Sequence, residues 1–401
     1  MFASRFVLHV AAILGLIAAL PIMTAAYTPI DWHLDATHHP VGRDFVNLWV
    51  GGRLLWEGSW QTLFDPGAYQ DALRQLFDPL VRPHVWSYPP TSFLLAAPLA
   101  LLPYGAALAT WTIAGLAAFL ATAQIGLETR AARHATWLLL LAPAVLLNIV
   151  CGQNGFLTAA LMAGGILTLD RRPVVAGILI GLLTYKPHFG IVLAPALLAL
   201  GAWRTIAVAA ATAAAMALVS VAVFGPEPWM AYVYETVPFQ ARLLRDFEGF
   251  FTSMLISPYA GLRGAGLPHV VSLGLQWAVA ALALAATVYG VRRTADAERR
   301  LAIVAAATFL ATPYALTYDL PVIALVIARL YARAPGATWT RLESALYGGA
   351  WAIPLASMPL SIVGAPLTPF LMAGLLALAL SPLMASPLPP WFQTKPSAQP
   401  G

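Results

Sequence analysis

The feature that most limits the possible folds is a series of apolar runs that recurs from one end of the chain to the other. The longest runs, residues 6–26, 104–127, 205–224 and 269–291, have 20 to 24 residues. A helix needs about 20 apolar residues to cross the ~30 Å hydrocarbon layer of a bilayer. Only 10% of the residues are charged, against roughly 25% in a soluble domain. The sequence therefore predicts an all-α, polytopic membrane protein.

Twelve runs are predicted to cross the membrane. They are residues 6–26, 104–127, 135–150, 156–169, 174–185, 189–201, 205–224, 269–291, 301–312, 318–330, 344–360 and 369–384. Residues 91–102 lie between prolines and are too short to cross, so they predict a half-inserted or interfacial helix. The first run resembles a cleaved signal peptide, but its length and the spans that follow favour a retained helix. One domain is expected over residues 1–386, followed by a disordered Pro-rich tail, 387–401.

The distribution of charge predicts the orientation. With the amino terminus in the cytoplasm, the inner side receives 14 of the 22 basic and 5 of the 17 acidic residues, a net charge of +9, and the outer side has −4. Short cytoplasmic loops are enriched in Lys and Arg, so this orientation is favoured. It sends two long hydrophilic loops, residues 27–90 and 225–268, to the outer face. The basic residues form no cluster of the kind that binds nucleic acid, and one cysteine permits no intramolecular disulfide.

The first outer loop contains a candidate acid–base residue, Asp44. It precedes apolar residues at i, i+3 and i+4 spacing, which predict an amphipathic helix lying on the membrane. Asp44 could cap that helix or act as a catalytic base, and the residues alone leave both open. Asp65-Pro66 opens a second short helix, where capping explains the Asp. Tyr88, in an aromatic and proline-rich segment, suits either an interfacial anchor or the wall of a sugar or prenyl site.

Two outer turns carry polar residues where apolar runs meet. Lys186 and His188 flank a proline at a depth where a cation costs about 2.5–3.5 kcal/mol. A functional role is therefore expected, and the alternative is a side chain that snorkels to the surface. Gln153 and Asn154 lie in a Gly-Gln-Asn-Gly turn, which an ordinary turn would also explain.

The second outer loop and the last outer turn add further charges. Residues 226–239 predict an interfacial helix, and Arg242 and Arg245 follow it three residues apart, so on a helix they would share one face. Two guanidinium groups can hold a phosphate in bidentate fashion, although a solvated charged face fits equally well. Tyr318 and Asp319 belong to the last turn, where Asp319 is either a helix cap or a site residue.

The order and common sidedness of these motifs resemble glycosyltransferase family 87, which holds polyprenol-phosphate-mannose-dependent mannosyltransferases of the C-type superfamily. The motifs are the outer Asp44-Phe45, the Tyr-Pro-Pro before the half helix, the Gly-Gln-Asn-Gly turn, the Lys-Pro turn and the late Thr-Pro…Tyr-Asp turn. The resemblance covers roughly residues 5–335. It implies transfer of a hexose, with mannose favoured, from a polyprenyl-phosphate donor to an acceptor at the outer face, with inversion at the anomeric carbon.

The resemblance also implies roles for particular residues. Asp44 matches the family's catalytic base, which takes the proton from the acceptor hydroxyl. Lys186 matches the Lys-Pro turn and is expected at the donor phosphate. We infer the same role for His188, Arg242 and Arg245. Substrate-binding roles are expected for Asn47, Tyr88, Gln153, Asn154, Tyr318 and Asp319. No metal cluster is evident in the sequence, so neither a metal nor another cofactor is expected.

The expected partners are a polyprenyl-phosphate-linked sugar, a glycolipid or glycan acceptor, and membrane lipids, with no nucleic acid. The predicted location is a bacterial cytoplasmic membrane, with a multi-pass chain whose active site faces the periplasm. The main alternative is a transporter or flippase for lipid-linked sugars, but such a protein should show related halves, and no convincing internal repeat is present. A purely structural subunit would leave the charges at residues 186–188 unexplained.

Overall fold

The computed structural model describes residues 2–28, 33–35 and 37–384, so the predicted tail, 387–401, lies outside the described residues. The protein is about 77% helical. Two short strands, β1 (Phe2–Ala3) and β2 (Thr338–Trp339), pair antiparallel. The predicted all-α class is confirmed.

The helices follow one another with short connections. The first ten are α1 (Ser4–Tyr27), α2 (Phe45–Trp56), α3 (Pro66–Leu76), α4 (Phe93–Leu99), α5 (Tyr104–Ala123), α6 (Thr129–Leu140), α7 (Pro143–Cys151), α8 (Gly155–Thr168), α9 (Pro173–Gly181) and α10 (Gly190–Ala199). The next ten are α11 (Trp203–Phe224), α12 (Glu227–Ala231), α13 (Val237–Asp246), α14 (Phe250–Met254), α15 (Pro258–Gly264), α16 (His269–Arg293), α17 (Ala297–Ala311), α18 (Pro321–Arg333), α19 (Arg341–Ile362) and α20 (Thr368–Met384). Short helical turns are η1 (Trp60–Phe64), η2 (Pro90–Ser92), η3 (Leu182–Tyr185), η4 (Pro187–Phe189), η5 (Tyr232–Thr236) and η6 (Thr317–Asp319).

The apolar helices make this chain a membrane protein, but the predicted twelve crossings are not confirmed. Among the described residues, α5, α11, α16 and α19 are long and apolar enough to span a bilayer, and α6 with α7 would make a fifth span that bends by 54°. Other apolar runs form helices of 10–17 residues. Proline is one cause of the breaks, because the residue before it is disfavoured in the α region. Pro143, for example, is the first residue of α7, so the apolar run 135–150 is divided between α6 and α7.

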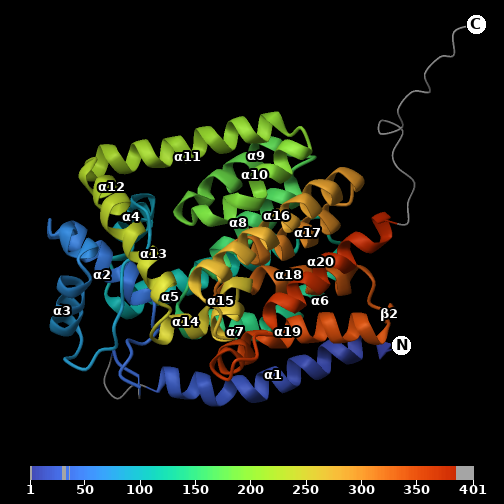
Figure 1. The fold of residues 1–401 in the computed structure, drawn as a ribbon, viewed down its shortest axis with the longest axis horizontal. Helices are drawn as coiled ribbons and strands as arrows, with labels where there is room; N and C mark the ends of the chain where they lie inside the picture. Colours follow the sequence, from blue (N-terminus) through green and yellow to red (C-terminus); the bar gives the residue numbers. More distant parts are fainter. Residues whose placement is uncertain (1, 29–32, 36, 385–401) are drawn as a thin grey trace, which may run out of the picture.

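The two long hydrophilic loops gather at one end of the molecule (Figure 1). Helices α2, α3 and α4 from the first loop lie there beside α12 and α13 from the second, while α1 and α19 run along one edge and α11 along the opposite edge. A hydrogen bond of 2.8 Å from Gln240 Nε2 to Ser87 Oγ joins the two loops. Residues far apart in the sequence therefore lie together at this end of the molecule.

Helix α2 forms where the apolar spacing predicted it, and it packs within the protein. Nine of its twelve residues are buried. At Gly52 the helix lies so close to α4 that a Cβ there would stand 2.1 Å from the carbonyl oxygen of Ala96. The half helix predicted at residues 91–102 is present as α4, and the two helices together give the first loop a packed core.

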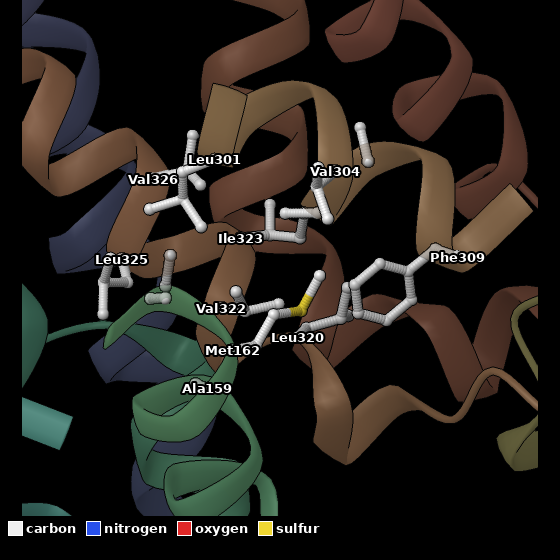
Figure 2. Close-up of a cluster of buried hydrophobic side chains, with 14 of the residues drawn as sticks. Ala159, Met162, Leu301, Val304, Phe309, Leu320, Val322, Ile323, Leu325 and Val326 are labelled. Atoms are coloured by element: carbon white, nitrogen blue, oxygen red, sulfur yellow. The ribbon is translucent and has the colours of Figure 1, made fainter. Parts of the chain in front are cut away.

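The main hydrophobic core lies between α8, α17 and α18 (Figure 2). Met162 of α8, Phe309 of α17 and Leu320 at the start of α18 are all buried there. Between helices in a membrane, side chains of this kind contribute through van der Waals packing. Because Leu320 directly follows Asp319, and because α8 begins directly after Asn154, this core fixes the position of both polar residues.

Candidate active site

The loop that carries Asp44 packs directly on the turn between α7 and α8. The backbone N–H of Asp44 donates to the carbonyl oxygen of Cys151 at 3.1 Å. Gly152 has a φ of +57°, and a Cβ there would lie 2.2 Å from the carbonyl oxygen of Gly42. Only glycine tolerates both conditions without strain. The first outer loop and the Gly-Gln-Asn-Gly turn are thus in backbone contact.

The carboxylate of Asp44 does not cap α2. No backbone N–H of the helix donates to it, whereas the Asp65 carboxylate accepts from Gly67 N and Ala68 N at 2.8 and 3.0 Å. Capping is therefore confirmed for Asp65 and is not seen for Asp44. Gln153 Nε2 instead donates to Asp44 Oδ2 at 2.9 Å. The Asp44 side chain remains 24% exposed, which leaves a carboxylate that a substrate can reach.

Tyr88 lies between the two amide side chains of the α7–α8 turn. Its hydroxyl donates to Gln153 Oε1 at 3.3 Å and accepts from Asn154 Nδ2 at 3.2 Å. Burial, with the nearby carboxylates of Asp44 and Asp319, raises the pKa of the Tyr88 hydroxyl well above its ordinary value. Tyr88 is therefore a neutral hydroxyl donor at physiological pH.

Lys186 is buried, with 5% of its surface exposed. Its Nζ donates to Asn154 Oδ1 at 3.0 Å and forms an ion pair with Asp319 Oδ1. The rings of Tyr318 and Phe189 lie 5.3 and 5.4 Å from the same nitrogen, within the range of a cation–π interaction. Snorkelling is therefore excluded for Lys186. Asp319 does not cap α18 either, because the cap position is Leu320 and no side-chain cap is present.

One connected set of polar side chains thus joins five segments of the chain. We call it the polar network, and its members are Asp44, Tyr88, Gln153, Asn154, Lys186 and Asp319. Unpaired polar groups are costly inside a protein, so a network of this kind must be satisfied to be tolerated. Among the described residues Asp319 Oδ2 is buried without a hydrogen-bond partner.

The other predicted site residues lie outside the polar network. Asn47 Oδ1 accepts from the Tyr69 hydroxyl at 2.9 Å, between α2 and α3. His188 is half-buried, and its Nε2 has no hydrogen-bond partner among the described residues. Arg242 and Arg245 are exposed on α13. Arg245 forms an exposed ion pair of 3.2 Å with its neighbour Asp246, whereas Arg242 has no ion pair or hydrogen bond in the described part of the chain and packs over Phe239.

Sequence reasoning missed His84. Its Nε2 lies 3.9 Å from Asp44 Oδ1, and its Nδ1 lies 2.8 Å from the carbonyl oxygen of Arg82. A carbonyl only accepts, so Nδ1 carries a proton and Nε2 is the nitrogen that faces Asp44. His84 stands in a long stretch without regular secondary structure, and no spacing there points to Asp44. Nearby His39 has its pKa lowered to about 4, mainly by burial and then by the Arg43 guanidinium.

The comparison with known families is decisive for the class of protein. The sequence pattern of glycosyltransferase family 87 matches residues 86–313. The chain belongs to glycosyltransferase family 87. The match contains Tyr88, the α7–α8 turn, Lys186 and α13, while Asp44 precedes it and Asp319 follows it. No curated protein and no solved structure matches the chain.

Membership of glycosyltransferase family 87 makes this chain a glycosyltransferase, an enzyme that uses a sugar donor and an acceptor. Within the described residues, no group of three or more His, Cys, Asp and Glu side chains is placed to hold a metal ion. The charged groups brought together around the α7–α8 turn are one ion pair and one further carboxylate.

Proposed function

We propose that this glycosyltransferase moves a hexose, with mannose favoured, from a polyprenyl-phosphate donor to a hydroxyl group of a glycolipid or glycan acceptor. The reaction inverts the anomeric carbon and takes place at the periplasmic face of a bacterial cytoplasmic membrane. The observation that supports it best is the Asp44 carboxylate, which is partly exposed, does not cap its helix and is held by Gln153. A carboxylate so placed has the requirements of a general base.

In the proposed step, Asp44 accepts the proton of the acceptor hydroxyl while that oxygen attacks the anomeric carbon. The bond from this carbon to the phosphate oxygen breaks, and polyprenyl phosphate leaves with the electron pair. Gln153 holds Oδ2 of Asp44, so Oδ1 is the oxygen we assign to the proton. A single displacement of this kind inverts the configuration.

The donor phosphate is assigned to the exposed face of α13. Arg242 and Arg245 lie there three residues apart, and guanidinium groups bind phosphate oxygens with paired N–H donors. The bond from Gln240 to Ser87 places α13 next to the segment of Tyr88. Lys186 was also expected at the phosphate, but its charge is already balanced by Asp319. His188 remains a candidate because its Nε2 is unpartnered among the described residues.

The proposal is tested with purified protein, radiolabelled polyprenyl-phosphate-mannose and bacterial membrane lipids. We expect a new radiolabelled glycolipid whose anomeric configuration is opposite to that of the donor. Polyprenyl-phosphate-glucose, assayed in parallel, tests the choice of sugar. A transporter would instead move the labelled donor across a liposome membrane and form no new product, and that result would overturn the proposal.

A further inference from the structure

The hydrogen bonds of the polar network have only one possible direction. Lys186 Nζ can only donate, so the atom of Asn154 that faces it is the oxygen, and the Nδ2 of Asn154 must then point at Tyr88. The carboxylate of Asp44 can only accept, so the atom of Gln153 that faces it is the nitrogen.

The orientation of the Tyr88 hydroxyl follows from its two neighbours. Asn154 Nδ2 donates to the hydroxyl oxygen, so the hydroxyl proton is free for Gln153 Oε1. The backbone N–H of Asn154 also donates to that Gln153 oxygen, at 3.2 Å, which fixes the same amide orientation independently. Every donor thus points from the ammonium of Lys186 towards the carboxylate of Asp44.

We infer that Lys186 is a positioning residue for Asp44, and that it acts through the oriented chain of Asn154, Tyr88 and Gln153. The inference rests on the proposed role of Asp44 as base and assigns Lys186 to that residue instead of to the donor phosphate. Lys186 only donates at one end and Asp44 only accepts at the other, so the bonds between them are aligned and polarise one another in the same sense. The chain stabilises the ionised carboxylate and keeps its free oxygen in one place.

The surroundings of Lys186 and Asp44 explain why these two residues are connected by a series of hydrogen bonds and not by direct contact. Lys186 is almost completely buried, and Asp319 forms a direct ion pair with it. Asp44 is partly exposed, because a substrate must reach it. Tyr88 connects the buried and the accessible parts, since its hydroxyl is the only link between Gln153 and the Asn154 side chain among the hydrogen bonds of the described residues.

The decisive variant is Tyr88→Phe, which keeps the ring against Trp86 and removes only the central hydroxyl. The matched control is Tyr259→Phe, which removes a buried hydroxyl that donates to the Leu244 carbonyl oxygen in the second loop. Asp44 is labelled with a carbodiimide, which reacts with protonated carboxyl groups, and its extent of labelling is followed by mass spectrometry from about pH 2 to about pH 8, a range that extends to both sides of the usual Asp pKa of ~3.9.

We expect the midpoint of Asp44 labelling in Tyr88→Phe to move up by a few tenths of a pH unit, because the bond from Gln153 to Asp44 remains and loses only the polarisation by its neighbour, about 10–30% of its strength. Tyr259→Phe should keep the wild-type midpoint. Equal midpoints in all three proteins would overturn the inference. This readout needs no catalysis, so it holds whatever Asp44 does in the reaction.

Activity then separates the inference from the proposed function. With Asp44 as base, Tyr88→Phe should lower kcat about twofold, because the bond from Gln153 to Asp44 is weakened and not lost, and should move the acidic limb of its pH profile upwards, with donor KM unchanged. If Asp44→Asn remains active while the labelling midpoint moves, the inference holds and the proposed base is wrong. If Asp44→Asn is inactive and the midpoint does not move, the base holds and the chain is only structural.

Lys186 is tested in the double variant Lys186→Met, Asp319→Asn, which removes both charges of the buried pair and leaves no unpaired ion. We expect the same upward movement of the labelling midpoint as in Tyr88→Phe. An increase of donor KM with an unchanged midpoint would return Lys186 to the donor phosphate and overturn the inference.

Discussion

Replacement of Asp44 by Asn gives the sharpest test of the proposed chemistry. The amide has the size of the carboxylate and its oxygen can still accept from Gln153, but it cannot take a proton from a hydroxyl. A positioned general base contributes about 10²–10⁴-fold to the rate, so kcat should fall by a factor in this range. Binding of the donor should be almost unchanged, because the phosphate is assigned to α13.

The structure also limits the effect of this substitution on stability. Asp44 does not cap α2, so no helix cap is lost. Its bond from Gln153 changes from charge-assisted to neutral, which costs about 1 kcal/mol. The protein should therefore be expressed and should melt within a few degrees of the wild type. Asp65→Asn is the matched control, because Asp65 is a genuine cap and Asn caps about as well as Asp.

The assay is the initial rate of transfer from radiolabelled polyprenyl-phosphate-mannose in reconstituted membranes, with the melting temperature measured on the same samples. Transfer by Asp44→Asn at close to the wild-type rate would refute the role of Asp44. The base would then have to be sought among Asp319, Glu248 and Asp246. A loss of activity in Asp65→Asn as well would show that the first loop responds to any change of charge.

Three further predictions concern other parts of the molecule. Single cysteines at Ser59 and Ser253, in a protein without its natural cysteine, should react with an impermeant thiol reagent from the periplasmic side, and reaction only after membrane disruption would reverse the orientation. Arg242→Ala should raise donor KM about tenfold, the effect of one lost charged hydrogen bond. Arg204→Ala, at the start of α11 and far along the chain from α13, should leave donor KM unchanged. The pKa of His39 is lowered to about 4, below the ordinary value of ~6.5, so the unfolded chain takes up the proton first. Stability should therefore fall between about pH 6.5 and pH 4, and a His39→Gln variant should lose this part of the pH dependence of melting.

The physical reason for the Arg242 expectation differs from that for Lys186. Arg242 is exposed and without an ion pair among the described residues, so its charge is available to a ligand. Lys186 is buried against Asp319, and its charge is not. In the sequence, both residues are cations of segments predicted to lie at the outer face. Only their surroundings distinguish the role proposed for Arg242 from the role proposed for Lys186.

The sequence alone determined the membrane class, the helical fold and the candidate site residues. Apolar runs near 20 residues long admit few solutions other than helices, and α5, α11, α16 and α19 lie where such runs predicted them. Asp44, Tyr88, Gln153, Asn154, Lys186 and Asp319 could all be selected from short motifs. The number of crossings could not be obtained in this way, because the ends of short helices depend on prolines and on packing against neighbours.

Only the tertiary structure determined which of these residues are in contact and which of their atoms form the hydrogen bonds. Lys186 and Asp319 are 133 positions apart, and Asp44 and Gln153 are 109 apart, so no local pattern relates them. A hydrogen bond requires its two heavy atoms to lie within about 3 Å, and the packing of α8, α17 and α18 sets the positions of Asn154 and Asp319 to that accuracy. Contacts within the first loop brought His84 to Asp44, and Asp44 does not form the cap that the sequence allowed. Residue types fix what a side chain can donate or accept, and the fold determines the atoms to which it does so.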